Sequence, residues 1–216
     1  AKVMFAMTIV VCGVANAELI EDSASGGHTL NGTANADEMY GYDGNDTLNG
    51  NAGGDHLYGG TEDDWLQGDA GADTYHFEDG FQNDIVYDYA ADVAEDLLIF
   101  GDGITEDNIQ LYKYTGSNSL ILSADGGLTT INLKDWFVSS NHRIDKIQFA
   151  GGEPQVFEDF VATKVLYVEG DGNNNTLTGY IYTNNVKGFA GIDNLNGTSG
   201  VDYLYGGEGR DTLEGG

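Results

Sequence analysis

The sequence predicts an all-β protein in which a β-rich spacer joins two right-handed parallel β-rolls. Three observations support this fold class. Two stretches repeat every nine residues, each repeat keeps the same residue types at fixed places, and the stretch between them consists of short runs of alternating apolar residues. A fixed short period is typical of a solenoid, and alternation is typical of strands.

The first array covers residues 32–76 and consists of five consecutive nines. Glycine stands first in each nine, aspartate sixth and a large apolar residue eighth. The sixth and eighth places hold Asp37 and Met39, Asp46 and Leu48, Asp55 and Leu57, Asp64 and Leu66, and Asp73 and Tyr75. Three columns in phase over five copies argue against a flexible Gly/Asp-rich linker, which would keep neither phase nor an apolar column.

Each nine is predicted to form a turn followed by a minimal strand. Glycine reaches positive φ without a steric clash and Asn or Asp tolerates it, so the first six residues form the turn. In the strand the eighth-place side chain points inward and its neighbours point outward. Two nines make one coil of 18 residues, and every second turn then stacks on the same edge. The predicted neighbours are Asp37 with Asp55, Asp46 with Asp64, and Asp55 with Asp73.

The stacked turns predict metal sites. Each turn presents a carboxylate and free backbone carbonyls to the next one, and a flexible site with many oxygen ligands suits Ca²⁺ rather than Mg²⁺ or Zn²⁺. We expect about three ions in this array. The candidate ligands are Gly32, Asn35, Asp37, Gly41, Asp43, Gly44, Asp46, Gly50, Gly53, Asp55, Gly59, Thr61, Glu62, Asp64, Gly68, Gly71 and Asp73.

The second array, residues 170–214, is again five nines, with Leu177, Val186, Leu195, Leu204 and Leu213 in the apolar column. Its sixth place holds Asn175, Asn184, Asp193, Asp202 and Asp211. Asparagine keeps an oxygen but loses the charge, so the first two turns should bind calcium weakly or not at all. Asp193 with Asp211 is the best predicted pair, Asn184 with Asp202 is a doubtful one, and we expect roughly one to three ions. The candidate ligands are Gly188, Gly191, Asp193, Gly197, Gly200, Asp202, Gly206, Gly209 and Asp211.

The remaining segments define the predicted boundaries 1–22, 23–77, 78–169 and 170–216. Residues 23–31 form a decayed nine in which His28 replaces the aspartate. His28 can be interpreted as a metal ligand, but we favour a capping turn that has lost its calcium ligand, because terminal repeats are atypical. Residues 77–152 lose the phase and predict short strands separated by Gly/Asn/Asp turns. Residues 155–169 predict a short helix and then a strand, and Trp136 with Phe137 is expected to cover an open end of a roll.

The nines resemble the calcium-binding nonapeptide of RTX proteins, G-G-x-G-x-D-x-U-x. The spacer resembles the haemolysin-type calcium-binding-related domain in four stretches, residues 71–85, 96–109, 133–137 and 143–152. The resemblance implies an exported bacterial-type protein, secreted or held at the cell surface, that folds when calcium binds outside the cell. It also implies a type I secretion apparatus as a partner, and a spacer that packs against the roll without catalytic activity.

Composition limits the partners. Eight Lys+Arg against 36 Asp+Glu give a net charge of −28, which argues against nucleic acid and against an anionic membrane surface. Binding of about six Ca²⁺ would add +12 and relieve much of the self-repulsion. A single cysteine, Cys12, excludes an internal disulfide framework and any cysteine-rich metal site.

Residues 1–17 resemble a secretory signal with cleavage before Glu18, and the apolar run is too short to span a bilayer. The alternative is a buried element of an upstream domain. The sequence carries no H-E-x-x-H, G-x-S-x-G, C-x-x-C or Walker motif, so we expect no catalysis in this stretch. The alternatives for the parent protein are a calcium-dependent adhesin or surface-layer protein, a secreted enzyme (protease, lipase or epimerase) and a cytolytic toxin, with the active domain elsewhere.

Overall fold

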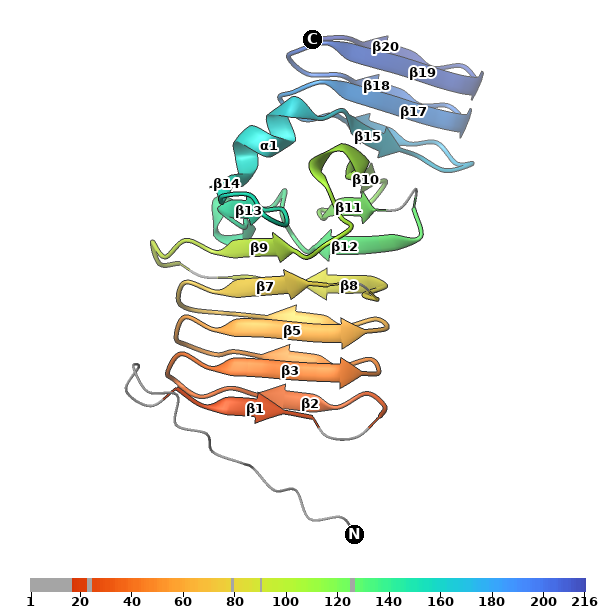
Figure 1. Ribbon diagram of the computed structural model, residues 1–216. Helices are drawn as coiled ribbons and strands as arrows, with labels where there is room; N and C mark the ends of the chain where they lie inside the picture. Colours follow the sequence, from red (N-terminus) through yellow and green to blue (C-terminus); the bar gives the residue numbers. More distant parts are fainter. Residues whose placement is uncertain (1–16, 23–24, 79, 90, 125–126) are drawn as a thin grey trace.

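The structure is a computed structural model, and it describes residues 17–22, 25–78, 80–89, 91–124 and 127–216. The signal-like segment, including Cys12, lies outside the described residues except for Ala17. Short strands stack along one axis (Figure 1). The spacer and its helix lie between a lower stack, formed by β1 to β9, and an upper stack, formed by β15 to β20.

The strands are β1 Leu19–Glu21, β2 Thr29–Asn31, β3 Glu38–Asp43, β4 Thr47–Asn49, β5 His56–Thr61, β6 Trp65–Gln67, β7 Thr74–Phe77, β8 Asn83–Val86, β9 Leu97–Phe100, β10 Gln110–Tyr114, β11 Leu120–Ala124, β12 Thr129–Leu133, β13 Lys146–Gln148, β14 Gln155–Val156, β15 Leu166–Glu169, β16 Thr176–Thr178, β17 Asn184–Gly191, β18 Asn194–Asn196, β19 Asp202–Gly209 and β20 Thr212–Glu214. The helices are α1 Phe157–Thr163 and two 3₁₀ turns, Glu106–Asn108 and Ser140–His142.

In the lower stack successive strands alternate between two parallel sheets. One sheet has the order β1-β3-β5-β7-β9-β13-β14, and the other runs β19-β17-β15-β10-β11-β12-β8-β6-β4-β2. Met39 lies opposite Leu57, and Leu48 opposite Leu66. The step between neighbouring strands is therefore 18 residues, which confirms the predicted coil.

Stacking extends past both predicted ends of the first roll. At the start, β1 pairs in parallel with β3, so the sheet begins before residue 23. At the other end, β8 pairs with β6 and β9 pairs with β7, both in parallel. The spacer therefore continues both sheets of the first roll past residue 78.

The spacer joins the two stacks through the ten-stranded sheet. Strands β10, β11 and β12 pair antiparallel in the middle of this sheet, while β8 and β15 flank them in parallel. Helix α1, which the apolar spacing predicted, buries Phe157, Phe160 and Val161. Trp136 packs on Phe157 with ring centroids 4.8 Å apart, and Phe137 meets Tyr180 of the upper stack at 5.4 Å. This pair of aromatic residues ties the spacer to both α1 and the upper stack.

The upper stack repeats the lower one, with β16, β18 and β20 forming its second sheet. Leu177 lies opposite Leu195, again an 18-residue step. The apolar column is buried throughout the lower stack and as far as Leu195 in the upper one. The expectation that the whole column is buried is wrong at Leu213, which is 46% exposed, because no described strand lies beyond β20 to cover it.

The interior is one continuous apolar column. Met39, Leu48, Leu57, Leu66 and Tyr75 are all 0% exposed. Burying a side chain of this size stabilises the folded state by roughly 1.5–3 kcal/mol.

No helix in the described residues combines the length and the apolar character that crossing a membrane requires.

Candidate metal sites in the turns

The sixth-place aspartates form two ladders along the edges of the lower stack. The backbone N–H of Asp37 donates to Oδ1 of Asp55 at 2.8 Å, and Asp55 donates to Oδ1 of Asp73 in the same way. On the other edge, Asp46 donates to Oδ1 of Asp64, also at 2.8 Å. All five side chains are buried. These contacts join the three pairs that the spacing predicted.

The second oxygen of most of these carboxylates is buried without a partner. Oδ2 of Asp46, Asp55, Asp64 and Asp73 makes no hydrogen bond to any described residue. An unsatisfied buried polar atom costs roughly 1–3 kcal/mol, and more when it is charged. A bound cation would remove this cost at each turn.

Asp37 is the exception, and the sequence did not reveal it. Its Oδ2 accepts the backbone N–H of Thr33 at 2.6 Å and the Thr33 hydroxyl at 3.0 Å. Thr33 thus supplies donors that the other four aspartates lack. The sequence does show that Thr33 follows the first-place glycine, Gly32. Only the turn geometry shows that the Thr33 hydroxyl reaches the Asp37 carboxylate.

The first-place glycines leave room beside the carboxylates. A Cβ on Gly50 would lie 2.4 Å from Oδ2 of Asp55 and 2.9 Å from the carbonyl oxygen of Gly68. A Cβ on Gly59 would lie 2.3 Å from Oδ2 of Asp64, and one on Gly68 would lie 2.3 Å from Oδ2 of Asp73. At Gly50, a side chain would fill the space between the orphaned carboxylate oxygen and a carbonyl oxygen of the next turn. This arrangement of oxygens fits Ca²⁺, which takes carboxylate and carbonyl ligands.

The other candidate ligands occupy the outer parts of the turns. Fourth-place glycines have positive φ, as Gly53 at 136° and Gly71 at 134° show. The Thr61 hydroxyl donates to Oδ1 of Asp43 at 3.2 Å. Asp43 and Glu62 are exposed, so their side chains do not join the buried ladder. The remaining candidates are glycines, which can offer only their backbone carbonyl oxygens as ligands, and Asn35. The side-chain amide of Asn35 donates to the Thr33 hydroxyl.

Burial makes the ladder carboxyls resist ionisation. It raises the pKa of Asp55 to about 6 and the pKa of Asp64 and of Asp73 to about 7 each. Carboxylates of neighbouring turns raise these pKa values further, while the backbone hydrogen bonds lower them. Burial therefore shifts Asp55, Asp64 and Asp73 toward the protonated acid, and a divalent cation would shift them toward the ionised form.

The ladders continue beyond the repeats through aspartates that sequence reasoning missed. Asp64 donates its backbone N–H to Oδ1 of Asp84 at 2.8 Å, and Asp73 donates to Oδ1 of Asp96 at 2.9 Å. Asp96 in turn donates to Oδ2 of Asp145 at 3.0 Å. The spacing grows from 18 to 20, 23 and 49 residues, which hides the column. The available signal was an aspartate two places before a buried strand residue. Asp84 precedes Val86 in this way, Asp96 precedes Leu98, and Asp145 precedes Ile147.

Another buried acid lies where the lower stack meets the spacer. Asp88 is 3% exposed and its Oδ1 has no hydrogen-bond partner among the described residues. Burial and the neighbouring Asp96 raise the pKa of Asp88. A cavity of about 340 Å³ opens beside it, lined also by Asp92, Asp96 and Asp145. Acidic groups thus gather at this junction as they do in the turns.

In the upper stack the turns differ from one another. Asp193 accepts the backbone N–H of Asn175 at 2.8 Å and keeps a buried, unpartnered Oδ2, as the lower turns do. Asp211 accepts the backbone N–H of Asp193 at 3.0 Å, which joins the best predicted pair. First-place Gly188, Gly197 and Gly206 face the carboxylates of their own nines, and fourth-place Gly191, Gly200 and Gly209 have positive φ.

Asn184 satisfies its turn with its own amide group. Its Nδ2 lies 2.7–3.0 Å from four oxygens, the carbonyls of Tyr180, Tyr182 and Gly197 and Oδ1 of Asp202. Its Oδ1 accepts the backbone N–H of Tyr180. The amide nitrogen therefore takes the place among turn oxygens that a cation would take elsewhere. This arrangement explains physically why the pair Asn184 with Asp202 is a poor candidate for calcium.

Parts of the chain match two protein-family models. Residues 24–57, 49–81 and 187–216 match the RTX calcium-binding nonapeptide repeat. Residues 120–153 match the haemolysin-type calcium binding protein related domain. The first match falls on the turns with orphaned oxygens, and the second falls on the spacer from the start of β11 to the loop between β13 and β14.

Proposed function

This chain carries the calcium-binding nonapeptide repeats of RTX proteins, and from this premise we propose that it is a calcium-driven folding module of an exported protein. The observation that carries the proposal is the row of buried Oδ2 atoms on Asp46, Asp55, Asp64 and Asp73. Without a cation, each turn must bury either an unpaired charge or a proton, and both weaken the fold. Binding free energy is therefore folding free energy in these turns.

Calcium concentration would set the folded fraction. Low cytosolic calcium leaves the acidic turns repelling one another, which suits passage of an extended chain through a type I secretion channel. Outside the cell, at millimolar calcium, a site with a dissociation constant near 10⁻⁴ M would contribute about 1.4 kcal/mol. Four such sites would contribute about 6 kcal/mol, comparable to the entire stability of a typical domain. Folding at the exit would also oppose backsliding into the channel.

We propose a structural role for the chain and place no catalysis in it. Its ladder acids are assigned to cation binding, and the spacer packs the two stacks together. The activity of the parent protein, whether adhesin, surface-layer protein, secreted enzyme or toxin, would then belong to another domain that this module stabilises.

Limited proteolysis with and without calcium tests the proposal. We expect the lower stack, residues 19–100, to be cleaved rapidly in excess chelator and to become protected when Ca²⁺ is restored, while equimolar Mg²⁺ protects much less. A titration in buffers of different ionisation enthalpy should also detect proton release near pH 7, because the bound ion displaces protons from Asp64 and Asp73. Equal protection with and without chelator would refute the proposal.

A further inference from the structure

The first turn of one ladder has histidine in place of aspartate. His28 precedes β2, whose Thr29 lies opposite Thr47 of β4, so His28 stands one turn before Asp46. Its backbone N–H donates to Oδ1 of Asp46 at 2.7 Å, as the ladder aspartates do to the next turn. His28 therefore keeps the backbone role of the column while it offers an imidazole nitrogen instead of a carboxylate.

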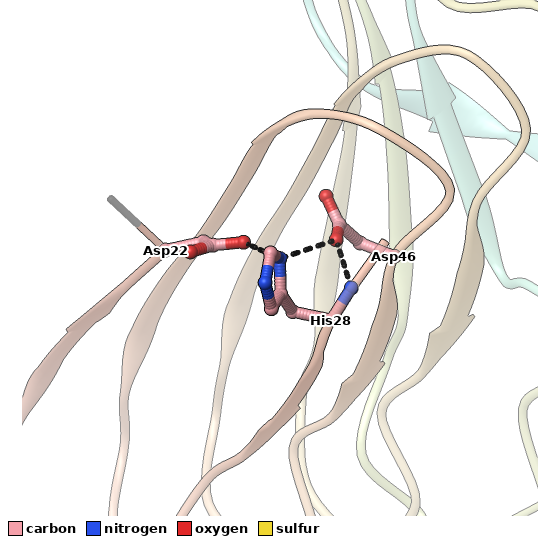
Figure 2. Close-up of side chains that lie close together, drawn as sticks. All are labelled: Asp22, His28 and Asp46. Carbon is pink, nitrogen blue, oxygen red and sulfur yellow. Dashed lines mark hydrogen bonds and ion pairs between the residues drawn. The ribbon is translucent and has the colours of Figure 1, made fainter. Parts of the chain in front are cut away.

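A second carboxylate approaches this histidine from the end of β1. The Asp22 backbone N–H donates to the carbonyl oxygen of Tyr40 at 2.9 Å, which holds Asp22 at the edge of the sheet. Oδ2 of Asp22 is in close contact with Nδ1 of His28, and Oδ1 of Asp46 lies 3.9 Å from the same nitrogen. Figure 2 shows the imidazole between the two carboxylates, and one ligand atom from each residue lies within 4.8 Å of the others.

The surroundings favour a metal ion over a simple surface cluster. The side chain of Asp46 is 0% exposed, that of Asp22 9% and that of His28 42%. Oδ2 of Asp46 is buried without a hydrogen-bond partner among the described residues. Asp46 therefore has one oxygen for an ion at the His28 turn and another for an ion in its own turn.

The ligand types distinguish this cluster from the all-oxygen turns. Imidazole nitrogen with carboxylate oxygen is a donor set for Zn²⁺ and related first-row ions, whereas Ca²⁺ prefers oxygen alone. In a tetrahedral zinc site, bond lengths of 2.0–2.2 Å separate the ligand atoms by roughly 3.4 Å. The separation of 3.9 Å between His28 Nδ1 and Asp46 Oδ1 requires only a small adjustment, whereas Asp22 Oδ2 and His28 Nδ1, which are in direct contact, must move apart to admit the ion. The exposed side of His28 leaves room for a water molecule as the fourth ligand.

We propose that Asp22, His28 and Asp46 bind a zinc-like divalent ion that closes the N-terminal end of the lower stack. This site goes beyond calcium-driven folding, because it uses a nitrogen ligand and a carboxylate from outside the repeats. It would fix β1 against the first turn of the ladder after the calcium sites have filled. The alternative is a capping ion pair between protonated His28 and Asp22, with no metal.

Zinc titration of the calcium-saturated chain separates these alternatives. In millimolar Ca²⁺, isothermal titration with Zn²⁺ should show one site in the unmodified chain. His28→Asn should weaken zinc binding at least tenfold, and Asp22→Asn should weaken it as well. Circular dichroism at saturating calcium should be unchanged in both variants, which would show that the stack still folds. Co²⁺ in place of Zn²⁺ should give visible absorption bands that vanish in His28→Asn.

Two control variants exclude other histidines. His56 Nδ1 and His76 Nε2 lie 3.0 Å apart and are the competing imidazole pair, so the double variant His56→Gln/His76→Gln should keep the zinc site. His142→Asn, in the spacer, should keep it too. The proposal is overturned if zinc binds His28→Asn as tightly as the unmodified chain, if the site disappears with His56 and His76, or if no zinc binds. Because calcium titration is measured separately, each of these results leaves the calcium proposal standing.

Discussion

The Asp55 turn of the lower stack and the Asn184 turn of the upper stack share one backbone design but satisfy it differently. In the first, Oδ2 of Asp55 is buried with no partner among the described residues. In the second, the Asn184 amide nitrogen lies among four oxygens at 2.7–3.0 Å. By position in the repeat, the equivalent oxygens around Asp55 belong to Asn51, Gly53, Gly68 and Asp73. We therefore expect calcium dependence to be set turn by turn, by whether the sixth residue brings its own donors.

The largest expected effect comes from removing a carboxylate in the middle of a ladder. Asp55 contacts the turn of Asp37 on one side and that of Asp73 on the other, so Asp55→Ala should damage two calcium sites. Losing one charge-assisted contact costs roughly 1.5–3 kcal/mol, so we expect calcium affinity to fall by at least about tenfold at each site. Calorimetric titration with Ca²⁺ measures both the affinity and the number of sites.

Two further variants calibrate this result. Asp37→Ala should cost less, because Asp37 ends the column of nines and Thr33 already satisfies its Oδ2. Asn175→Ala should change calcium binding little, whereas Asp193→Ala should weaken the best site of the upper stack. Equal losses for Asp55→Ala and Asn175→Ala would show that stacking at 18 residues does not create the sites.

The second expected effect is a pH dependence of the metal-free lower stack. Folding raises the pKa of Asp64 and of Asp73 from 3.8 to about 7, so the folded state binds more protons than the unfolded one between these values. This stabilisation is complete below about pH 4 and is lost as the pH rises through 7. In excess chelator, the β signal in circular dichroism should therefore be larger at pH 4.5 than at pH 8. A β signal that grows as the pH rises would contradict the protonated-acid picture, and Asn184, which cannot titrate, should contribute nothing to it.

Asn184→Asp is the third test, because it converts the self-satisfied turn into one of the calcium type. The change removes the donors that hold Tyr180, Tyr182 and Asp202, so at limiting calcium the upper stack should lose roughly 1–3 kcal/mol of stability. With calcium present, titration should count one additional ion. Asn194→Asp, the same change at an exposed position of β18, is the matched control and should add no ion. An unchanged ion count in Asn184→Asp would show that the amide does not occupy a cation position.

The smallest expected effect concerns the first-place glycines. In Gly50→Ala the new Cβ would meet Oδ2 of Asp55 at 2.4 Å, which should destabilise the calcium-loaded stack by roughly 1–3 kcal/mol. Gly172→Ala adds the same methyl group where no atom lies within 4 Å, and its stability should stay within about 0.5 kcal/mol of the unmodified chain. Thermal unfolding in saturating calcium measures both. Equal stability of the two variants would mean that the glycine column serves only the turn conformation.

The sequence predicted the coil and the Asp37–Asp55, Asp46–Asp64 and Asp55–Asp73 contacts because a constant period fixes which turns stack. It did not predict Asp84, Asp96 and Asp145, because insertions change the spacing while the backbone ladder continues.

The amide cage of Asn184, the Thr33 donors and the approach of Asp22 to His28 were also absent from the sequence prediction. Each depends on side-chain orientation in a folded turn, which residue type and period do not specify. The exposure of Leu213 depends on whether another strand covers it, and the local pattern around Leu213 carries no such information.

Calcium titration followed by far-ultraviolet circular dichroism tests the central claim most directly. The chelated chain at neutral pH should show mostly disorder, at least over the two stacks. Adding Ca²⁺ should restore the β signal in a cooperative transition, and equimolar Mg²⁺ should restore much less, because Mg²⁺ demands octahedral geometry and dehydrates reluctantly. A complete β signal in excess chelator at neutral pH would contradict the account, since the unpartnered carboxylates would then need no cation.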